Sequence, residues 1–447
     1  MTRPLLKKPS LDPSDLNSFR PISNLSFVSK TVERAIDIQF TSYANKNSLF
    51  PVYQSAYRTH HSTETAVACI YNDLVSAIDQ GHVGALVLLD LSLAFDTVDH
   101  DVMMNVLHQR FGVENKACDW FRSYFEDRKQ VVCIQGDTSI EQSLTCSVPQ
   151  GSVLGPKAFL AYAEDVADIF TAHQLQYHLY ADDMQGSAHS RPADVAAVVT
   201  RLQNCVADVG AWCSSKRLQL NAKKTEVLFF GSAVNLTELQ PETLQFCVRG
   251  DIIKPVSVVR DLGVYFDSQL TVKYHIGKVA ATCFYHLRRL RAVRKQLGRD
   301  VTQQLVSALI LSRLDYCNVV LAGLPDKSLA PLQRVLNAAA RLVLDLKPRD
   351  HLTTAFRELH WLPIRQRIEY KLCLMVHLAV GGRAPPYLSN CLTFVSQLPG
   401  RSSLRSAQST DLYVPRTRLK IGERAYRVAA PRAWNRLPPT IRSVTST

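Results

Sequence analysis

The four residues Tyr180-Ala181-Asp182-Asp183 place two carboxylates side by side, directly after the mostly apolar stretch 175–179. Two adjacent acids at a point where a strand should reverse have the layout of a metal site. The run 85–89 reads as a buried strand that ends on a third carboxylate, Asp90, where a ligand can leave an apolar core and face a cleft. The three carboxylates are therefore predicted to lie together at one site.

Such a cluster is unstable without a counterion. Like charges about 4 Å apart repel by roughly 4 kcal/mol at an effective dielectric of about 20. Divalent cations remove this cost, and oxygen-only ligands favour Mg²⁺, with Mn²⁺ as the alternative metal. The other interpretation is that Asp182 and Asp183 form only a polar turn, because Asp is common in turns.

Two further segments favour the first interpretation. Phe95 follows five residues after Asp90, and a loop punctuated by Gly and Pro occupies residues 147–156, between the two carboxylate segments. A loop that feeds a helix offers free backbone N–H groups to anions. In this order and spacing, the segments resemble the palm of the reverse transcriptases. The resemblance implies an α+β fold arranged as a polymerase right hand, with fingers, a palm with a split βαβ sheet and a helical thumb.

The resemblance also implies catalytic roles. Asp90 and Asp182 would hold two metals that activate the primer 3′-hydroxyl and steady the leaving pyrophosphate. The backbone carbonyl of Leu91 would help to hold a metal, and Asp183 would be the accessory acid. Lys224 matches a family lysine that can protonate the departing pyrophosphate, and its alternative reading is a surface lysine before a strand.

Four residues are implied to contact the incoming nucleotide. Phe95 matches an aromatic residue beneath the sugar, where a flat ring would clash with a ribose 2′-hydroxyl; an ordinary core aromatic is the alternative. Gln150 and Gly151 match residues against the nascent base pair and the sugar-phosphate, and the alternative is a plain turn. Arg20 matches a triphosphate clamp, for which Lys8 is a weaker second candidate.

The amino-acid sequences of these segments most resemble those of non-LTR retrotransposon polymerases from the jockey-like group of long interspersed elements. Three residues depart from the family pattern. Ser147 and Ala56 stand where these enzymes usually have Gly, and a positive φ at Ser147 would strain the loop. Lys157 replaces an apolar residue, so it would put an unpaired charge into a packed helix.

The charge distribution suits a polyanionic partner. The formal net charge is +13, and residues 268–299 contain eight Lys/Arg without any Asp or Glu. Apolar residues recur there at helical spacing, so a basic helix could track a nucleic-acid backbone through Arg288, Arg291 and Lys295. The alternative is an ordinary charged solvent face. A second basic run, 401–442, has ten Lys/Arg and four Pro, and it predicts a loosely ordered tail that could bind RNA.

The positions of Gly and Pro and the periodicity of apolar residues predict four parts. They are partial fingers over 1–84, a palm with the polymerase active site over 85–249, a primer grip and helical thumb over 250–350, and a C-terminal helical region with a basic Pro/Arg-rich tail over 351–447. A long amphipathic helix is predicted from near Pro192 to Trp212, and the primer-grip hairpin over 259–266.

The sequence thus predicts an RNA-directed DNA polymerase that extends a DNA primer on an RNA template with deoxynucleoside triphosphates. An RNA-templated RNA polymerase is less favoured, because such enzymes usually carry Gly where Ala181 stands. A catalytically impaired nucleic-acid-binding relic of a mobile element is the alternative from a different class.

Cysteine spacing and the length of the apolar stretches predict the cellular location. The eleven cysteines show no Cys-x-x-Cys spacing, and no apolar stretch has transmembrane length. These features predict an intracellular protein of the nucleus or cytoplasm with no membrane partner. Elements of this type commonly carry an endonuclease before the polymerase, and Met1 stands only a few residues before the fingers block, so a truncated copy that cannot nick DNA is expected.

Overall fold

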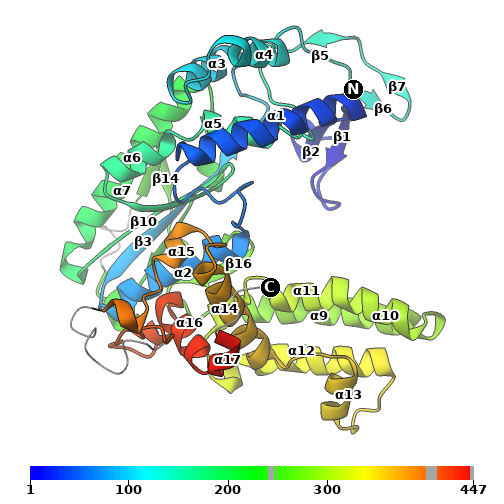
Figure 1. Cartoon of the computed structure of the whole chain (residues 1–447), viewed down its shortest axis with the longest axis vertical. Coiled ribbons are helices and arrows are strands. Elements are labelled where there is room, and N and C mark those ends of the chain that lie inside the picture. Colours follow the sequence, from blue (N-terminus) through cyan, green and yellow to red (C-terminus); the bar gives the residue numbers. More distant parts are fainter. Residues whose placement is uncertain (240–245, 249, 399–409, 443–447) are drawn as a thin grey trace.

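The computed structural model describes residues 1–239, 246–248, 250–398 and 410–442. Two arms extend from a central sheet toward the same side (Figure 1). One arm contains the N-terminal strands and the helix that follows them, and the other consists of the helices that span residues 273–358. This arrangement places the sheet at the base of both arms.

The central sheet has four antiparallel strands in the order β12-β3-β10-β9. They are β3 (Val83–Leu89), β9 (Gln176–Tyr180), β10 (Asp183–Ser190) and β12 (Glu226–Phe230). Strand β3 lies in the interior, and six of its seven residues are buried. Its sequence is therefore a continuous apolar run, as expected for a strand covered on both faces.

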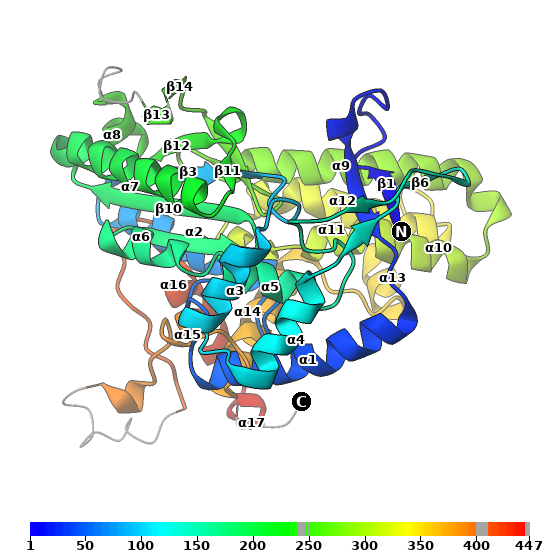
Figure 2. The same ribbon diagram turned by 90° about the horizontal axis from the view of Figure 1, so that it is seen from above.

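Helices cover the sheet from two sides (Figure 2). Helix α7 (Val195–Ser215) contacts β3 and β10, α6 (Val166–Ala172) contacts β9, and α2 (Thr63–Asp79) contacts β3 and β9. Successive residues of β3 divide between two cores, because Ala85 and Val87 share a core with α7 whereas Leu86 shares one with α2. The amphipathic helix predicted near Pro192 is confirmed as α7.

The first arm combines segments from two predicted parts. Strands β1 (Thr2–Leu6) and β2 (Phe19–Ser23) pair along their full length, and α1 (Phe27–Lys46) follows. A bridge from Thr2 to Val132 joins them to elements within the predicted palm range. These are α3 (His100–Gln109), α4 (Asn115–Phe125), β5 (Lys129–Gln130), β6 (Cys133–Ile134), β7 (Asp137–Thr138), β8 (Gln142–Ser143) and α5 (Gly155–Tyr162).

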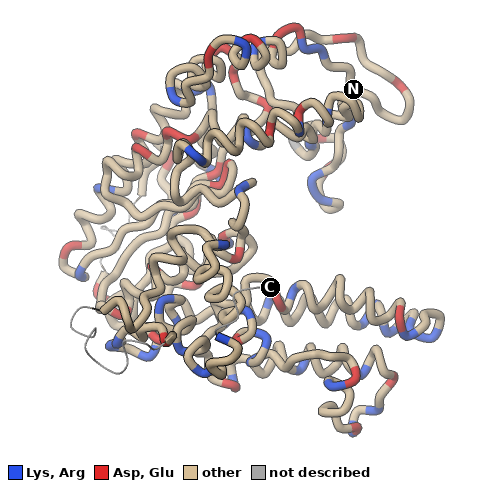
Figure 3. The backbone as a smooth tube through the Cα atoms, viewed as in Figure 1, with Lys and Arg blue, Asp and Glu red and all other residues tan. Residues whose placement is uncertain are grey.

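The second arm begins with a hairpin of β15 (Val258–Asp261) and β16 (Val264–Asp267), at the position predicted for the primer grip. Helix α9 (Lys273–Val293) follows and packs along α12 (Asp326–Leu344). Figure 3 marks Lys and Arg along this arm. Its other helices are α10 (Arg299–Val306), a π-helical turn (Ser307–Leu311), α11 (Ser312–Asp315) and α13 (Leu352–Glu358).

The C-terminal region packs on the base of this arm and on α2. It consists of α14 (Ile364–Val380), α15 (Pro386–Ser389), α16 (Tyr426–Asn435) and α17 (Pro439–Arg442). The prediction of a loosely ordered tail is wrong for residues 410–442. Tyr426, Val428 and Trp434 are buried there and hold the segment against α14 and α2. Residues 401–409 of that tail lie outside the described residues.

Among the helices of the described part of the chain, none combines the length and the apolar character that a membrane crossing requires.

Candidate active site

The turn between β9 and β10 presents both acids of the Tyr-Ala-Asp-Asp motif. Tyr180 pairs with Asp183, so Ala181 and Asp182 form the turn itself. Ala181 has a φ of +56°, in the left-handed region that tight hairpin turns use. The two carboxylates therefore stand at the very end of the hairpin.

The register of the sheet brings the third carboxylate to the same place. Met184 lies opposite Leu89, so Asp183 stands beside the end of β3, and Asp90 is the next residue after that strand. Strand β4 (Leu91–Ser92) then pairs with β11 (Gln219–Leu220). This pairing also carries Lys224 into the site, where its Nζ lies 3.0 Å from Oδ2 of Asp90.

A single cavity of about 510 Å³ collects the residues predicted for catalysis, metal binding and nucleotide binding. They come from five segments that are far apart in the sequence. The predicted residues that line the cavity are Arg20, Asp90, Leu91, Phe95, Gln150, Gly151, Asp182, Asp183 and Lys224. The fold thus assembles the predicted site from its scattered parts.

The carboxyl groups of this cavity repel one another. Burial raises the pKa of Asp182, and the charge of Asp90 raises it further, whereas Arg20 and Lys224 act in the opposite direction. Burial together with the charges of Asp182 and Asp90 raises the pKa of Asp183 to about 6. Burial and the neighbouring carboxylates thus both disfavour the charged forms of Asp182 and Asp183, and a bound cation would favour them.

The donor set fits a hard divalent cation, because it consists of carboxylate oxygens. Within the described residues, no group of three or more His, Cys, Asp or Glu side chains is placed to hold a metal by itself. Mg²⁺ is usually bound by one or two carboxylates together with substrate phosphates and waters. The site therefore suits a metal whose coordination a nucleotide completes.

Two neighbouring side chains orient the predicted nucleotide contacts. Phe95 stacks on Phe159, with ring centroids 4.7 Å apart and an interplanar angle of 26°. Gln150 donates from Nε2 to both carboxylate oxygens of Asp96, at 2.9 and 3.0 Å. Both side chains are held in place before any nucleotide binds, which limits the entropy lost on binding.

Glycine is required at position 151. Its φ is +105°, and a Cβ would lie 3.0 Å from the carbonyl oxygen of Ser23. The carbonyl of Gln150 accepts a hydrogen bond from the N–H of Ser23 at 2.7 Å. Because Ser23 ends β2, the strand that carries Arg20, the N-terminal hairpin and the Gln150 loop form one continuous wall of the cavity.

The departures from the family pattern have different outcomes. Ser147 has a φ of +97°, which confirms the positive φ on which the predicted backbone strain depends. Lys157 is buried as predicted and forms no ion pair within the described residues, but its Nζ donates a hydrogen bond to the carbonyl of Tyr57. Ala56 is fully buried.

Three polar or charged residues of the site were not predicted from the sequence. Lys7 and Tyr57 line the cavity, and Asp96 both lines it and holds Gln150. Lys8, the second candidate for the triphosphate, lines an adjoining cavity of about 520 Å³ instead. Successive residues of an extended segment point to opposite sides, so the pair Lys7-Lys8 did contain a signal that one of the two faces the nucleotide.

The predicted nucleic-acid contacts lie outside this cavity. Arg288 and Arg291 are exposed on α9, and Lys295 is exposed in the turn that follows it. The structure adds exposed aromatic rings between the cations of this helix. The guanidinium of Arg289 lies 5.7 Å from the centroid of Tyr285, which is 50% exposed. Alternating rings and cations suit base stacking and phosphate contacts.

An antiparallel sheet that presents a strand-end carboxylate beside a turn of two carboxylates, in a cavity with an aromatic side and cationic walls, defines the palm of a template-directed polymerase. A family model described as reverse transcriptase (RNA-dependent DNA polymerase) matches residues 6–274. The chain belongs to this family. Polymerases of the family generally use divalent metals.

The chain is also similar to polymerases of fly transposons. It is 27% identical to a probable RNA-directed DNA polymerase from transposon BS of Drosophila melanogaster, over 81% of this chain and 40% of that protein. It is 23% identical to the RNA-directed DNA polymerase from mobile element jockey of Drosophila funebris, over 75% of this chain and 36% of that protein. The chain thus spans about two fifths of the length of the curated relatives it matches.

Among solved structures, the chain is similar to telomerases. The apo telomerase from Candida tropicalis truncated from the C-terminal domain matches with a TM-score of 0.40 and 12% identity, over 56% of this chain and 51% of that one. The telomerase from Candida albicans in complex with a fragment of telomeric RNA matches with a TM-score of 0.40 and 13% identity, over 77% and 64%.

Proposed function

We propose that this chain is an RNA-directed DNA polymerase, which extends the 3′ end of a DNA primer on an RNA template with deoxynucleoside triphosphates. One observation carries this proposal. In a chain that belongs to the reverse transcriptase family, all the residues predicted for catalysis, metal binding and nucleotide binding line one cavity. We further propose an intracellular site of action and the four-part division into fingers, palm, thumb and C-terminal region.

Asp90, Asp182 and the carbonyl of Leu91 would hold Mg²⁺ or Mn²⁺, with Asp183 as the accessory acid. When bound, the metal would make the primer 3′-hydroxyl more acidic and would neutralise charge on the departing phosphates. Lys224 stands next to this site with its ammonium 3.0 Å from Asp90. That position allows its Nζ to give a proton to the leaving pyrophosphate.

The other wall of the cavity would select and orient the nucleotide. Arg20 neutralises the triphosphate, and Phe95, fixed by Phe159, excludes a ribose 2′-hydroxyl. Gln150 and Gly151 lie against the nascent base pair and its sugar-phosphate. Outside the cavity, Arg288, Arg291 and Lys295 contact the phosphate backbone of the template and primer.

The test is primer extension on poly(rA) with oligo(dT), dTTP and Mg²⁺, by the parent chain and by Asp182→Asn. The variant should lose extension while its RNA affinity stays nearly constant, because it loses a metal ligand but no phosphate contact. Asp119→Asn is the control, since it removes one exposed carboxylate on α4. Retained extension by Asp182→Asn would overturn the metal assignment. An inactive parent that still binds RNA would support the nucleic-acid-binding relic instead.

A further inference from the structure

Tyr387, in the short helix α15, lies buried beside the central sheet, in a region to which the sequence assigned no chemistry. It is 5% exposed. Its hydroxyl lies 2.8 Å from Oγ of Ser55 and 3.0 Å from Oγ1 of Thr65. Its ring stacks on Tyr53 and meets the edge of His178. These contacts join a residue outside the family match to the neighbourhood of the catalytic turn.

Ser55 belongs to a segment that supports this turn from the edge of the sheet. The N–H of Leu179 donates to the carbonyl of Tyr53, and the N–H of Ser55 donates to the carbonyl of Leu179, each at 2.9 Å. Oε1 of Gln54 accepts from the N–H of Ala181 at 3.2 Å. Because Ala181 directly precedes Asp182, residues 53–55 hold the turn that carries the metal ligand.

The hydroxyl of Ser55 lies between two buried rings. Nε2 of His178 is 2.8 Å from Oγ of Ser55, and burial lowers the pKa of His178 to about 3, so its ring is neutral. Because Tyr387 donates to Thr65, Ser55 must donate to Tyr387 and accept from His178, which assigns the proton of the neutral ring to Nε2. His178 then donates to Ser55, Ser55 to Tyr387, and Tyr387 to Thr65, so every hydroxyl donates in one direction.

We propose that Tyr387 is a positioning residue for polymerisation. It fixes Ser55, and through Ser55 it fixes residues 53–55 against the turn that carries Asp182. The inference rests on the proposed function. Tyr387 does not line the catalytic cavity, so it acts only through this segment. The C-terminal region also holds the start of α2 by an ion pair between Lys371 and Glu64 at 2.7 Å.

Three substitutions test the proposal. Tyr387→Phe keeps the ring contacts and removes both hydroxyl hydrogen bonds. Ser55→Ala interrupts the same chain from the opposite side, which preserves the test if the first variant does not fold. Tyr426→Phe is the matched control, because Tyr426 is 3% exposed in the same region and its hydroxyl has no hydrogen-bond partner among the described residues.

The measurements are kcat with poly(rA) and oligo(dT), the Mg²⁺ concentration that gives half-maximal extension, RNA affinity, and amide hydrogen exchange of residues 176–184. In Tyr387→Phe, kcat should fall roughly 10- to 100-fold, because a misplacement of about 1 Å can cost about 100-fold. The required Mg²⁺ concentration should rise and the amide of Ala181 should exchange faster, while RNA affinity stays constant. Tyr426→Phe should resemble the parent in all four.

Hydrogen exchange separates this proposal from the proposed function. If the parent chain does not extend primers, the proposed function fails, and faster exchange at the turn in Tyr387→Phe and Ser55→Ala still supports the positioning contact. Unchanged exchange at Ala181 overturns the proposal whatever the activity. Faster exchange with parental kcat and parental Mg²⁺ dependence also overturns it, because the contact would then serve stability alone.

Discussion

Phe95 is fixed on one side by Phe159 and lines the cavity that we propose for the nucleotide. Phe95→Val should therefore open space for a 2′-hydroxyl, so that ribonucleotide incorporation rises while deoxynucleotide incorporation falls less. The measurement is the ratio of kcat/KM for UTP and dTTP on poly(rA). Phe121→Val is the control, because this buried ring belongs to the first arm and does not line the cavity. An unchanged ratio in Phe95→Val would show that Phe95 is only a packing residue.

Ser147 pays a conformational cost at its φ of +97°. Ser147→Gly should raise the free energy of unfolding by about 1 kcal/mol, since strain at such positions is of order 1–3 kcal/mol and Gly loses about 0.5–1 kcal/mol of it to backbone entropy. Urea unfolding measures the change. Ser143→Gly, at an exposed position in β8, should be destabilising instead. If both substitutions lower stability, Ser147 is not strained.

The residues that sequence reasoning found share one property: each belongs to a short block whose neighbours in the sequence confirm it. Asp90 and Phe95 stand in one block, and Asp182 and Asp183 in another. Two residues that it missed, Asp96 and Tyr387, are defined by partners far away in the sequence. Asp96 matters because it holds Gln150, and Tyr387 because it meets Ser55, and neither contact leaves a local pattern.

At the scale of elements, α9 is expected to contact the template through its cations. Replacing Arg288, Arg291 and Lys295 by Gln should flatten the dependence of log K for RNA on log salt by about 2, at about 0.7 for each contact with a single strand. Filter binding or fluorescence anisotropy over a salt series measures this slope. An unchanged slope would mean that α9 does not contact RNA.

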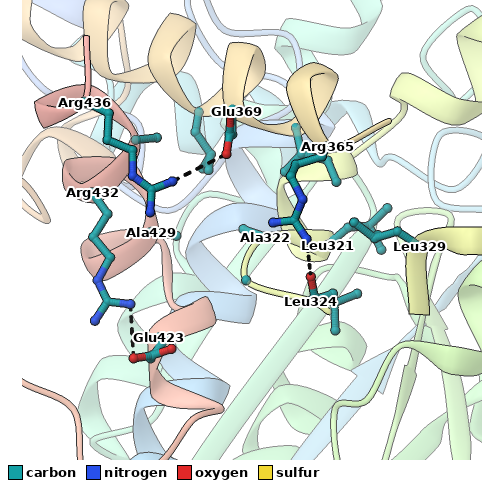
Figure 4. A pocket seen from close by; sticks show the side chains of 14 residues that line it. Leu321, Ala322, Leu324, Leu329, Arg365, Glu369, Glu423, Ala429, Arg432 and Arg436 are labelled. Carbon is teal, nitrogen blue, oxygen red and sulfur yellow. Dashed lines mark hydrogen bonds and ion pairs between the residues drawn. The ribbon is translucent and has the colours of Figure 1, made fainter. Parts of the chain in front are cut away.

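A control with equal charge is available in the pocket of about 210 Å³ between α14 and α16 (Figure 4). Arg432 pairs there with Glu423 at 3.2 Å and Arg436 with Glu369 at 3.5 Å, and Arg365 also lines the pocket. Replacing these three arginines by Gln removes the same charge without touching α9. This variant should keep the parental slope of log K for RNA against log salt. A flatter slope in this variant would indicate a general effect of net charge.

The elements themselves were predictable where periodicity was strong and compositional bias was weak. The apolar run of β3 and the stripe of α7 are of this kind. Helix α16 was not, because Arg and Pro dominate the composition of its region and suggested an unpacked tail. Its few apolar residues decide the outcome, since Tyr426 and Trp434 bury large rings against α14 and α2.

For the whole molecule, the buried histidine between the sheet and the C-terminal region predicts a loss of stability in acid. The pKa of His178 is lowered to about 3 in the folded protein, so below about pH 6.5 only the unfolded chain takes up this proton. Stability is therefore present above that pH and is lost as the pH falls. Between pH 7 and 5 the loss due to His178 should be about 2 kcal/mol.

Urea unfolding of the parent and of His178→Gln at both pH values measures this contribution, because Gln can still accept or donate to Ser55 but does not titrate. His351→Gln, at an exposed position before α13, is the control and should keep the parental pH dependence. Equal pH dependence in the parent and His178→Gln would exclude His178 as the source.

The hydrogen bond between Ser55 and Tyr387 joins residues 332 positions apart. At ribosomal rates of about 5–20 residues per second, Tyr387 is synthesised roughly 20 to 70 seconds after Ser55. Once Asp183 has been added, and until Tyr387 follows, every acid of the catalytic turn already exists in the nascent chain, but the support from Tyr387 does not. If Tyr387 positions the turn as proposed, a stop codon or frameshift between Asp183 and Tyr387 would abolish the proposed polymerase activity while each proposed metal ligand is still encoded and translated.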